Sequence, residues 1–279
     1  MRALRESVPS ILLFLCAALA IGPHGAAAHD FFLIPDDATP ERDAPLRVAM
    51  HVSDVFPGAP VAWRGPQVGD FFLVDASGRV PLEGAPVEGD PAAARLTLRH
   101  AGGAVIALRT TPSQIELSPE EFEDYLRHEG HDAILRAWRE GPSAGHAARE
   151  RYSRCVKTIV HAPGRSSGVE LRRVGLPIEI VPEARTARLR AGESLPVQVF
   201  VDETPYADGY LCATHAGYSA EHDAYSWCGR LDAEGRARVP ISAPGWQLIR
   251  ITRMVPLRDD PQADWESIWA SLTFEVHSR

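Results

Sequence analysis

The residue with the most distinctive chemistry is a histidine that directly follows an export sequence. Residues 1–28 carry Arg2 and Arg5, then an apolar run from Ile11 to Ile21, and they end in three alanines. This order is typical of a secretory signal peptide, and an apolar run of about 11 residues is too short to span a membrane. Cleavage after residue 28 would make His29 the first residue of a soluble, exported chain.

An N-terminal histidine offers two nitrogens to one metal ion, its free α-amine and a ring nitrogen. The amine has a reference pKa of about 7.7–8.0, so a metal ion displaces only a weakly held proton near neutral pH. Further imidazoles would complete a site suited to nickel, cobalt or copper, which prefer nitrogen ligands. Cleavage could equally leave a histidine there by accident, and both interpretations of His29 stay open.

His51 is the next candidate ligand. Residues 46–53 alternate between apolar and other side chains, which predicts a half-buried strand with His51 on its exposed face. Such a position suits a metal ligand, and it is also typical of a histidine that is simply solvated.

Cys212 and Cys228 are the one plausible disulfide between strand-like segments, and an exported protein would oxidise them. Closing a loop of about 16 residues contributes roughly 3 kcal/mol in the chain-entropy model. The loop contains His215 and His222, with Glu221 and Asp223 on either side of His222. It is either a pre-organised metal or ligand site, or a long hairpin with polar tips that the disulfide holds in place.

The sequence gives little support to other kinds of functional site. His128 and His131 are three residues apart with Gly130 between them, whereas a zinc-protease helix needs histidines four apart. We find no nucleophile elbow, P-loop or dinucleotide-binding glycine motif. The net charge of −8 argues against a nucleic-acid partner, which requires a basic face. No later apolar run is long enough for a transmembrane segment in the mature chain.

The elements that must position these residues are mainly strands. Residues 29–117 show short period-two runs punctuated by proline and glycine, which predicts an antiparallel β-sandwich. Residues 118–162 are predicted to form a helical hairpin, because Ser118, Pro119 and Glu121 make a helix start with a capping box. Its second helix is expected at about residues 147–160.

The rest of the chain predicts a second small domain. Residues 163–175 are the best linker candidate, since they begin with a run rich in glycine and serine. Residues 176–279 contain about six strand-like runs, which predicts a second β-sandwich. The expected fold is therefore mainly β, with two antiparallel sandwiches and a helical hairpin after the first.

Several segments occur together in an order that resembles a known family. They are Ala28–Pro35, Pro112–Leu117, Glu121–Leu126, Arg151–Arg154, Leu176–Pro182 and Asp264–Phe274. Together they look like the bacterial periplasmic family catalogued as domain of unknown function 4198, some of whose members accompany nickel/cobalt uptake systems. The resemblance implies Ig-like or transthyretin-like β-sandwiches and a periplasmic metal-handling role. By position, His29 and His51 match histidines expected in that family, whereas Arg253 stands where relatives tend to have a histidine.

These observations predict a periplasmic, non-catalytic binding protein for a transition-metal ion, nickel or cobalt first and copper as a further candidate. His29 would bind the ion, supplemented by His51 or by His215 and His222, and the protein would pass it to an inner-membrane uptake complex. One alternative is an enzyme with an N-terminal-histidine copper site. Another is a metal-free Ig-like scaffold or interaction module, because fold does not fix function.

Overall fold

The structure is a computed structural model that describes residues 29–62, 67–82, 92–164 and 167–278. The signal peptide predicted for residues 1–28 lies outside the described residues. Within them, no helix has both the length and the apolar character needed to cross a membrane.

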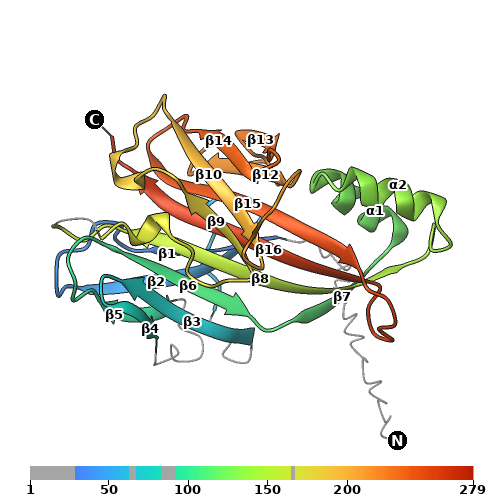
Figure 1. The fold of residues 1–279 in the computed structure, drawn as a ribbon, viewed down its shortest axis with the longest axis horizontal. Coiled ribbons are helices and arrows are strands. Elements are labelled where there is room, and N and C mark those ends of the chain that lie inside the picture. The colour runs from blue at the N-terminus through green and yellow to red at the C-terminus, as the bar shows by residue number, and fades with distance from the viewer. Residues whose placement is uncertain (1–28, 63–66, 83–91, 165–166, 279) are drawn as a thin grey trace, which may run out of the picture.

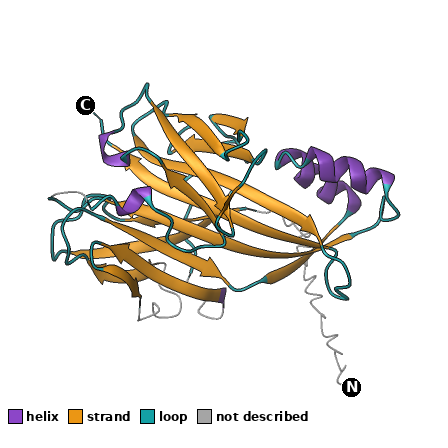
Figure 2. Ribbon diagram, in the orientation of Figure 1, coloured by secondary structure: helices purple, strands orange, loops and turns teal. Residues whose placement is uncertain are grey.

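Strands dominate the fold, with one helical hairpin beside them (Figure 2). The helices are α1 (Pro119–His128) and α2 (Asp132–Glu140), with short 3-10 turns at Val169–Leu171 and Thr186–Arg188. The strands are β1 (Asp30–Pro35), β2 (Pro45–Ser53), β3 (Val68–Asp75), β4 (Gly78–Pro81), β5 (Ala92–Thr97), β6 (Ala104–Thr110), β7 (Ser113–Leu117), β8 (Ala148–Val160), β9 (Ile178–Pro182), β10 (Ser194–Val201), β11 (Thr204–Pro205), β12 (Tyr210–His215), β13 (Trp227–Arg230), β14 (Arg236–Pro240), β15 (Gly245–Pro256) and β16 (Trp265–Val276). The predicted mainly β fold is confirmed.

The strands form three sheets, and the largest is shared by both halves of the chain (Figure 1). Its nine strands run in the order β13-β12-β15-β16-β8-β6-β3-β4, with β7 also paired to β8. A three-stranded sheet, β1-β2-β5, and a four-stranded sheet of β9, β10, β11 and β14 complete the fold. All pairs are antiparallel except β8 with β16, which are parallel.

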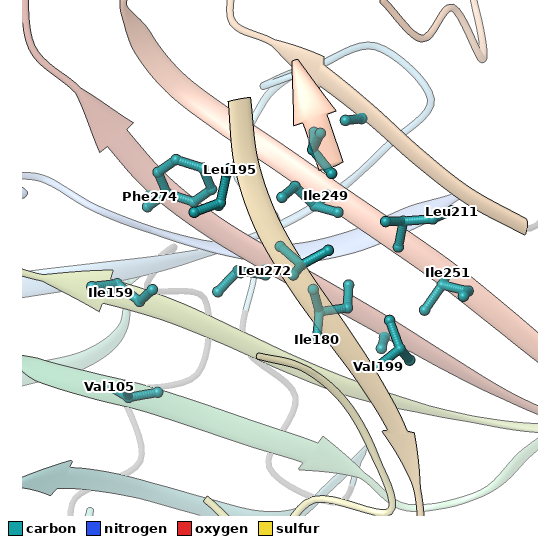
Figure 3. Close-up of a cluster of buried hydrophobic side chains, with 14 of the residues drawn as sticks. Val105, Ile159, Ile180, Leu195, Val199, Leu211, Ile249, Ile251, Leu272 and Phe274 are labelled. Carbon is teal, nitrogen blue, oxygen red and sulfur yellow. The ribbon is translucent and has the colours of Figure 1, made fainter. Parts of the chain in front are cut away.

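The two smaller sheets cover opposite faces of the large one. Alternate residues of β6 point to different cores: Val105 and Ala107 pack with β9 and β10, whereas Ile106 and Leu108 pack with β1 and β2. Figure 3 shows the first of these cores, which includes Val105 and Ile159 together with Ile180 and Leu272. A strand buried on both faces has no polar side, which explains the unbroken apolar run of β6.

The helical hairpin is present, but its second helix was predicted at the wrong place. α1 begins at Ser118 with the expected capping box, and α2 follows it directly. Residues 147–160 were expected to be a helix, whereas residues 148–160 form the strand β8. Residues 155–160 of β8 are buried on both faces, so no alternation marks them as a strand, but Val156, Thr158 and Ile159 are β-branched and favour one.

The hairpin packs at one end of the large sheet (Figure 1). Phe122 and Leu126 of α1 and Trp138 of α2 form a small core with Met254 of β15 and the partly buried Trp265 of β16. The division of the chain at residues 163–175 into separate domains stays a prediction. The β8–β16 pairing crosses that division, so the two halves share main-chain hydrogen bonds.

Candidate metal site

Two imidazoles from distant parts of the chain meet at one carboxylate, that of Asp54. His29 Nδ1 lies 3.6 Å from Asp54 Oδ2, and His222 Nδ1 makes a hydrogen bond with the same oxygen. We call His29, Asp54 and His222 the Asp54 site. Since all three side chains carry nitrogen or oxygen donors, their meeting point is chemically suited to a divalent cation.

The start of β1 and the end of β2 place the first two of these residues. β1 and β2 pair antiparallel with Asp30 opposite Ser53, so the residues just outside this pair, His29 and Asp54, are neighbours. The three-stranded sheet therefore brings the first described residue of the chain to a carboxylate 25 positions later.

The loop between β12 and β13 brings the third residue. The predicted Cys212–Cys228 disulfide is confirmed, and it joins directly opposite residues of the two strands. At the tip of this loop the Asp223 amide donates a hydrogen bond to the Asp54 carbonyl at 2.8 Å. His222 is thus held over Asp54 by a main-chain contact in addition to its own side chain.

The electrostatics of the Asp54 site favour a cation. Burial alone raises the pKa of Asp54, but the hydrogen bond from His222 and the charges of His222 and His29 outweigh it and hold that pKa below its usual range. Asp223 has a raised pKa, first because it is partly buried and also because Asp30 and Asp54 are negative neighbours. Asp54 and Asp223 supply negative charge that a metal ion would balance, whereas the charge of Asp30 is already paired with Arg250.

One nitrogen of the Asp54 site has no hydrogen-bond partner. His29 Nδ1 is buried and forms no hydrogen bond with any residue that the structure describes, since its 3.6 Å distance from Asp54 Oδ2 is too long for one. An unsatisfied buried polar atom costs about 1–3 kcal/mol, so such an atom in a native fold needs an explanation.

A buried charge network lies behind the Asp54 site and fixes Asp30, the residue after His29. Arg250 of β15 is fully buried, and it donates to Asp30 Oδ1 at 2.7 Å and to the two Glu129 oxygens at 2.5 and 2.8 Å. Tyr225 donates to Asp30 Oδ2 at 2.9 Å, and Thr252 donates to Glu129 at 2.7 Å. The network connects β1, β15, the disulfide loop and the end of α1.

His51 does not occupy the exposed position that the strand pattern predicts. Its side chain is buried, with the ring stacked on Phe32 at 5.4 Å and Nδ1 at 2.9 Å from the Pro57 carbonyl oxygen. Burial lowers its pKa. The prediction of exposure is wrong because a small apolar cluster of Phe32, Phe56 and Leu248 covers this end of β2 on its second face.

His215 also lies apart from the Asp54 site. Its Nδ1 is 3.1 Å from the Ala216 carbonyl oxygen, and its ring contacts Tyr218. The structure therefore brings together two of the four predicted ligands, His29 and His222. Their roles as ligands, and those of His51 and His215, stay predictions.

Asp54 was not singled out from the sequence. The signal was weak, since Asp54 simply follows a strand and precedes a turn containing Pro57 and Gly58. Its proximity to His222 comes from a contact across 168 positions of the chain, which no local pattern reports.

His128 and His131 belong to different elements. His128 ends α1 and His131 is the N-cap of α2. Each has a buried Nε2 without a hydrogen-bond partner, and the His128 ring lies 5.6 Å from that of Tyr225. In the parts of the chain that the structure describes, no three or more side chains of His, Cys, Asp or Glu are arranged to hold a metal ion as they stand.

Comparison with protein families identifies the family of this chain. The family model described as "Domain of unknown function (DUF4198)" matches residues 26–254. The chain belongs to this family. The match covers the Asp54 site, the helical hairpin and most of the large sheet, so the resemblance to the DUF4198 family is confirmed, although the segment Asp264–Phe274 lies beyond the matched residues.

Other comparisons give distant similarity. No curated protein matches the chain. Among solved structures, the D0–D1 domain of intimin is similar over 88% of this chain and 98% of its own, with 14% identity and a TM-score of 0.22. Two tandem V-type regions of VCBP3, a v-region-containing chitin binding protein, are similar over 86% and 98% respectively, with 8% identity and a TM-score of 0.19.

Proposed function

We propose that this protein binds a divalent transition-metal ion, nickel or cobalt first, at the Asp54 site and carries it without catalysis. The observation that supports this proposal most is the convergence of the His29 and His222 ring nitrogens on a single Asp54 oxygen. A second support is the buried His29 Nδ1, which has no hydrogen-bond partner and which a metal ion would satisfy.

The spacing of these atoms is close to that of ligands around one ion. Metal–nitrogen bonds of about 2.0–2.1 Å put two ligands of the same ion roughly 3.0–3.5 Å apart. His29 Nδ1 and Asp54 Oδ2 are 3.6 Å apart, so a small movement suffices on that side. Between His222 Nδ1 and Asp54 Oδ2, the ion would take the place of the proton in their hydrogen bond, and it would move these two atoms further apart.

A fourth donor follows from the predicted signal-peptide cleavage. In the full chain the nitrogen of His29 belongs to the peptide bond with Ala28, whereas in the cleaved chain it is a free amine. Nδ1 is the ring nitrogen closer to the main chain, so the amine and Nδ1 can chelate one ion in a six-membered ring. The nitrogen of His29 that lacks a partner is therefore the one that chelation requires.

The donor set suits a carrier. Nitrogen and oxygen ligands hold nickel or cobalt less tightly than thiolates do, which makes release easier. His222 is 76% exposed, so the ion can leave through that side. We propose that the exported protein collects the ion in the periplasm and delivers it to an inner-membrane uptake complex.

Calorimetric titration with Ni²⁺ tests the proposal, using a chain that begins at His29. We expect one-to-one binding that weakens at least tenfold when a glycine precedes His29 and also in the His222→Ala variant. His215→Ala is the matched control, since it removes a histidine from the same disulfide loop and should leave the affinity unchanged. Equal affinity with and without the extra glycine would refute the chelate. Copper-dependent consumption of peroxide in parallel would favour a copper enzyme instead.

A further inference from the structure

A pocket lies between the three-stranded sheet and the large sheet, next to the Asp54 site but separate from it. Its cavity volume is about 80 Å³. One enclosed water needs about 10–15 Å³ of such volume, so the pocket has room for roughly five to eight water-sized groups. Its lining includes Phe31 of β1, Met50 and Val52 of β2, Thr110 of β6, and Tyr152 and Arg154 of β8.

Among the described residues of this lining, Arg154 has the one charged side chain, and few of its donors are used. Nη2 donates to the His29 carbonyl at 3.3 Å, and the buried Nε has no hydrogen-bond partner in the described part of the chain. The guanidinium stacks over the rings of Tyr152 at 4.8 Å and Phe31 at 5.9 Å. Among the described residues, no carboxylate lies within ion-pair distance of Arg154.

Neighbouring arginines on the same strand behave differently. Arg149 pairs with Asp264 at 2.8 Å, and Arg151 pairs with Asp260 at 2.8 Å and with Glu266 at 2.9 Å. Those two arginines are satisfied within the fold. Arg154 instead presents a partly desolvated cation to a cavity, which is costly unless an anion pairs with it.

We propose that this pocket binds a small organic monocarboxylate with a short apolar chain. Guanidinium and carboxylate match as two parallel hydrogen-bonded pairs, and such charge-assisted bonds are stronger than neutral ones. The Thr110 hydroxyl, which already accepts from the Arg154 amide at 2.9 Å, can donate its hydrogen to the same carboxylate. Phe31, Met50 and Val52 then surround the apolar chain.

Size and charge restrict the ligand class further. The volume admits an acid of about four to six heavy atoms, such as propionate or butyrate, and excludes long-chain acids from complete burial. An amine would meet the like charge of Arg154, and an alcohol would leave the guanidinium unpaired. The ligand is therefore selected by its carboxylate first and by its length second.

The test is an NMR titration of the chain from residue 29 with butyrate, in the presence of EDTA so that no metal ion contributes. We expect saturable one-to-one shifts at Phe31 and Tyr152, none with butylamine or butanol, and at least tenfold weaker binding in Arg154→Met. Arg79→Met is the matched control, because Arg79 also stacks on an aromatic ring, that of Phe72, but pairs with Asp70. This variant should bind butyrate like the original chain.

A second variant covers the case in which Arg154→Met fails to fold. Val52→Phe leaves the guanidinium in place and fills the pocket, so it should abolish butyrate binding. The proposal is overturned if neither propionate nor butyrate gives saturable shifts, or if a folded Arg154→Met or Val52→Phe binds as the original chain does. Because EDTA is present, these outcomes are independent of whether the Asp54 site binds a metal ion.

Discussion

At the scale of single residues, the Asp54 site depends on side chains that do not touch the proposed ion. Arg250 has no access to solvent, and its charge is compensated by Asp30 and Glu129. The two carboxylates outweigh the effect of burial and hold the pKa of Arg250 well above its ordinary value. The network therefore stays ionised inside the protein and fixes the main chain next to His29.

Arg250→Met should destabilise the fold by about 3–5 kcal/mol, because it leaves two carboxylates buried without their partner. Urea denaturation measures the change. Arg139→Ala is the control, since Arg139 pairs with Glu123 at the surface, where solvent screens the pair, and its loss should change the stability far less. Equal stability of Arg250→Met and the original chain would show that the network contributes nothing.

The acid sensitivity of the fold should depend on Glu129. Burial raises the pKa of Glu129, but the charge and hydrogen bonds of Arg250 outweigh it and hold the pKa below the ordinary value of 4.5. The unfolded chain therefore takes up the Glu129 proton first as pH falls, so this carboxylate stabilises the fold above pH 4.5 and loses that contribution below it. The stability gap between the original chain and Glu129→Gln should be widest near neutral pH and should shrink below pH 4.5. A gap that does not change with pH would contradict the assignment.

At the scale of elements, the hairpin of α1 and α2 is held to the β-sheets by its turn. Arg230 of β13 donates to the Gly130 carbonyl at 2.6 Å and pairs with Asp132, while Glu129 belongs to the Arg250 network. Gly130 has a φ of 66°, and a Cβ there would lie 2.5 Å from the Tyr210 ring. The turn therefore needs glycine for its backbone conformation and for its close approach to β12.

Gly130→Ala should destabilise the protein by about 1–3 kcal/mol, through left-handed strain and overpacking together. Gly145→Ala is matched in backbone conformation, with a φ of 73°, but a Cβ there meets nothing within 4 Å. Its cost should be only the strain, about 1 kcal/mol. If thermal melting gives the same loss for both variants, the contact with Tyr210 is not the reason for the glycine.

Strands could be predicted from the sequence where one of their faces is polar. β2 follows the alternation of its sequence as far as Met50, and the capping box of Ser118 marks the start of α1. β8 was not predictable in this way, because the second half of the strand is buried on both faces. Burial between two sheets removes the polar half of the pattern on which sequence reasoning depends.

At the scale of the whole molecule, the candidate site is a product of long-range pairing. His29 and Cys212–Cys228 could be recognised locally, from a cleavage pattern and from two oxidisable cysteines. Asp54 could not, because its partners come from β1 and from the tip of the disulfide loop. The parallel pairing of β8 with β16, which joins residues more than 100 positions apart, is likewise absent from any local pattern.

Because both halves of the chain contribute strands to the nine-stranded sheet, we predict that the chain unfolds as one unit. Separating residues 29–162 from the rest would expose the long edge of β8 that pairs with β16, along with the apolar side chains of its core. Calorimetry of the chain from residue 29 should give a single transition, and residues 29–162 alone should show no cooperative melting. Two transitions, or a stable fragment, would mean that the predicted division at residues 163–175 separates independent domains.

The proposed metal-carrier function depends most directly on where a metal ion binds. Anomalous diffraction at the nickel edge, from crystals of the chain beginning at His29 grown with Ni²⁺, locates the ion without reference to any functional assay. We predict one strong peak about 2.0–2.1 Å from His29 Nδ1 and from its amine, with Asp54 and His222 completing the coordination. A peak at His51 or His215 instead, or no peak near His29 at saturating Ni²⁺, would contradict it.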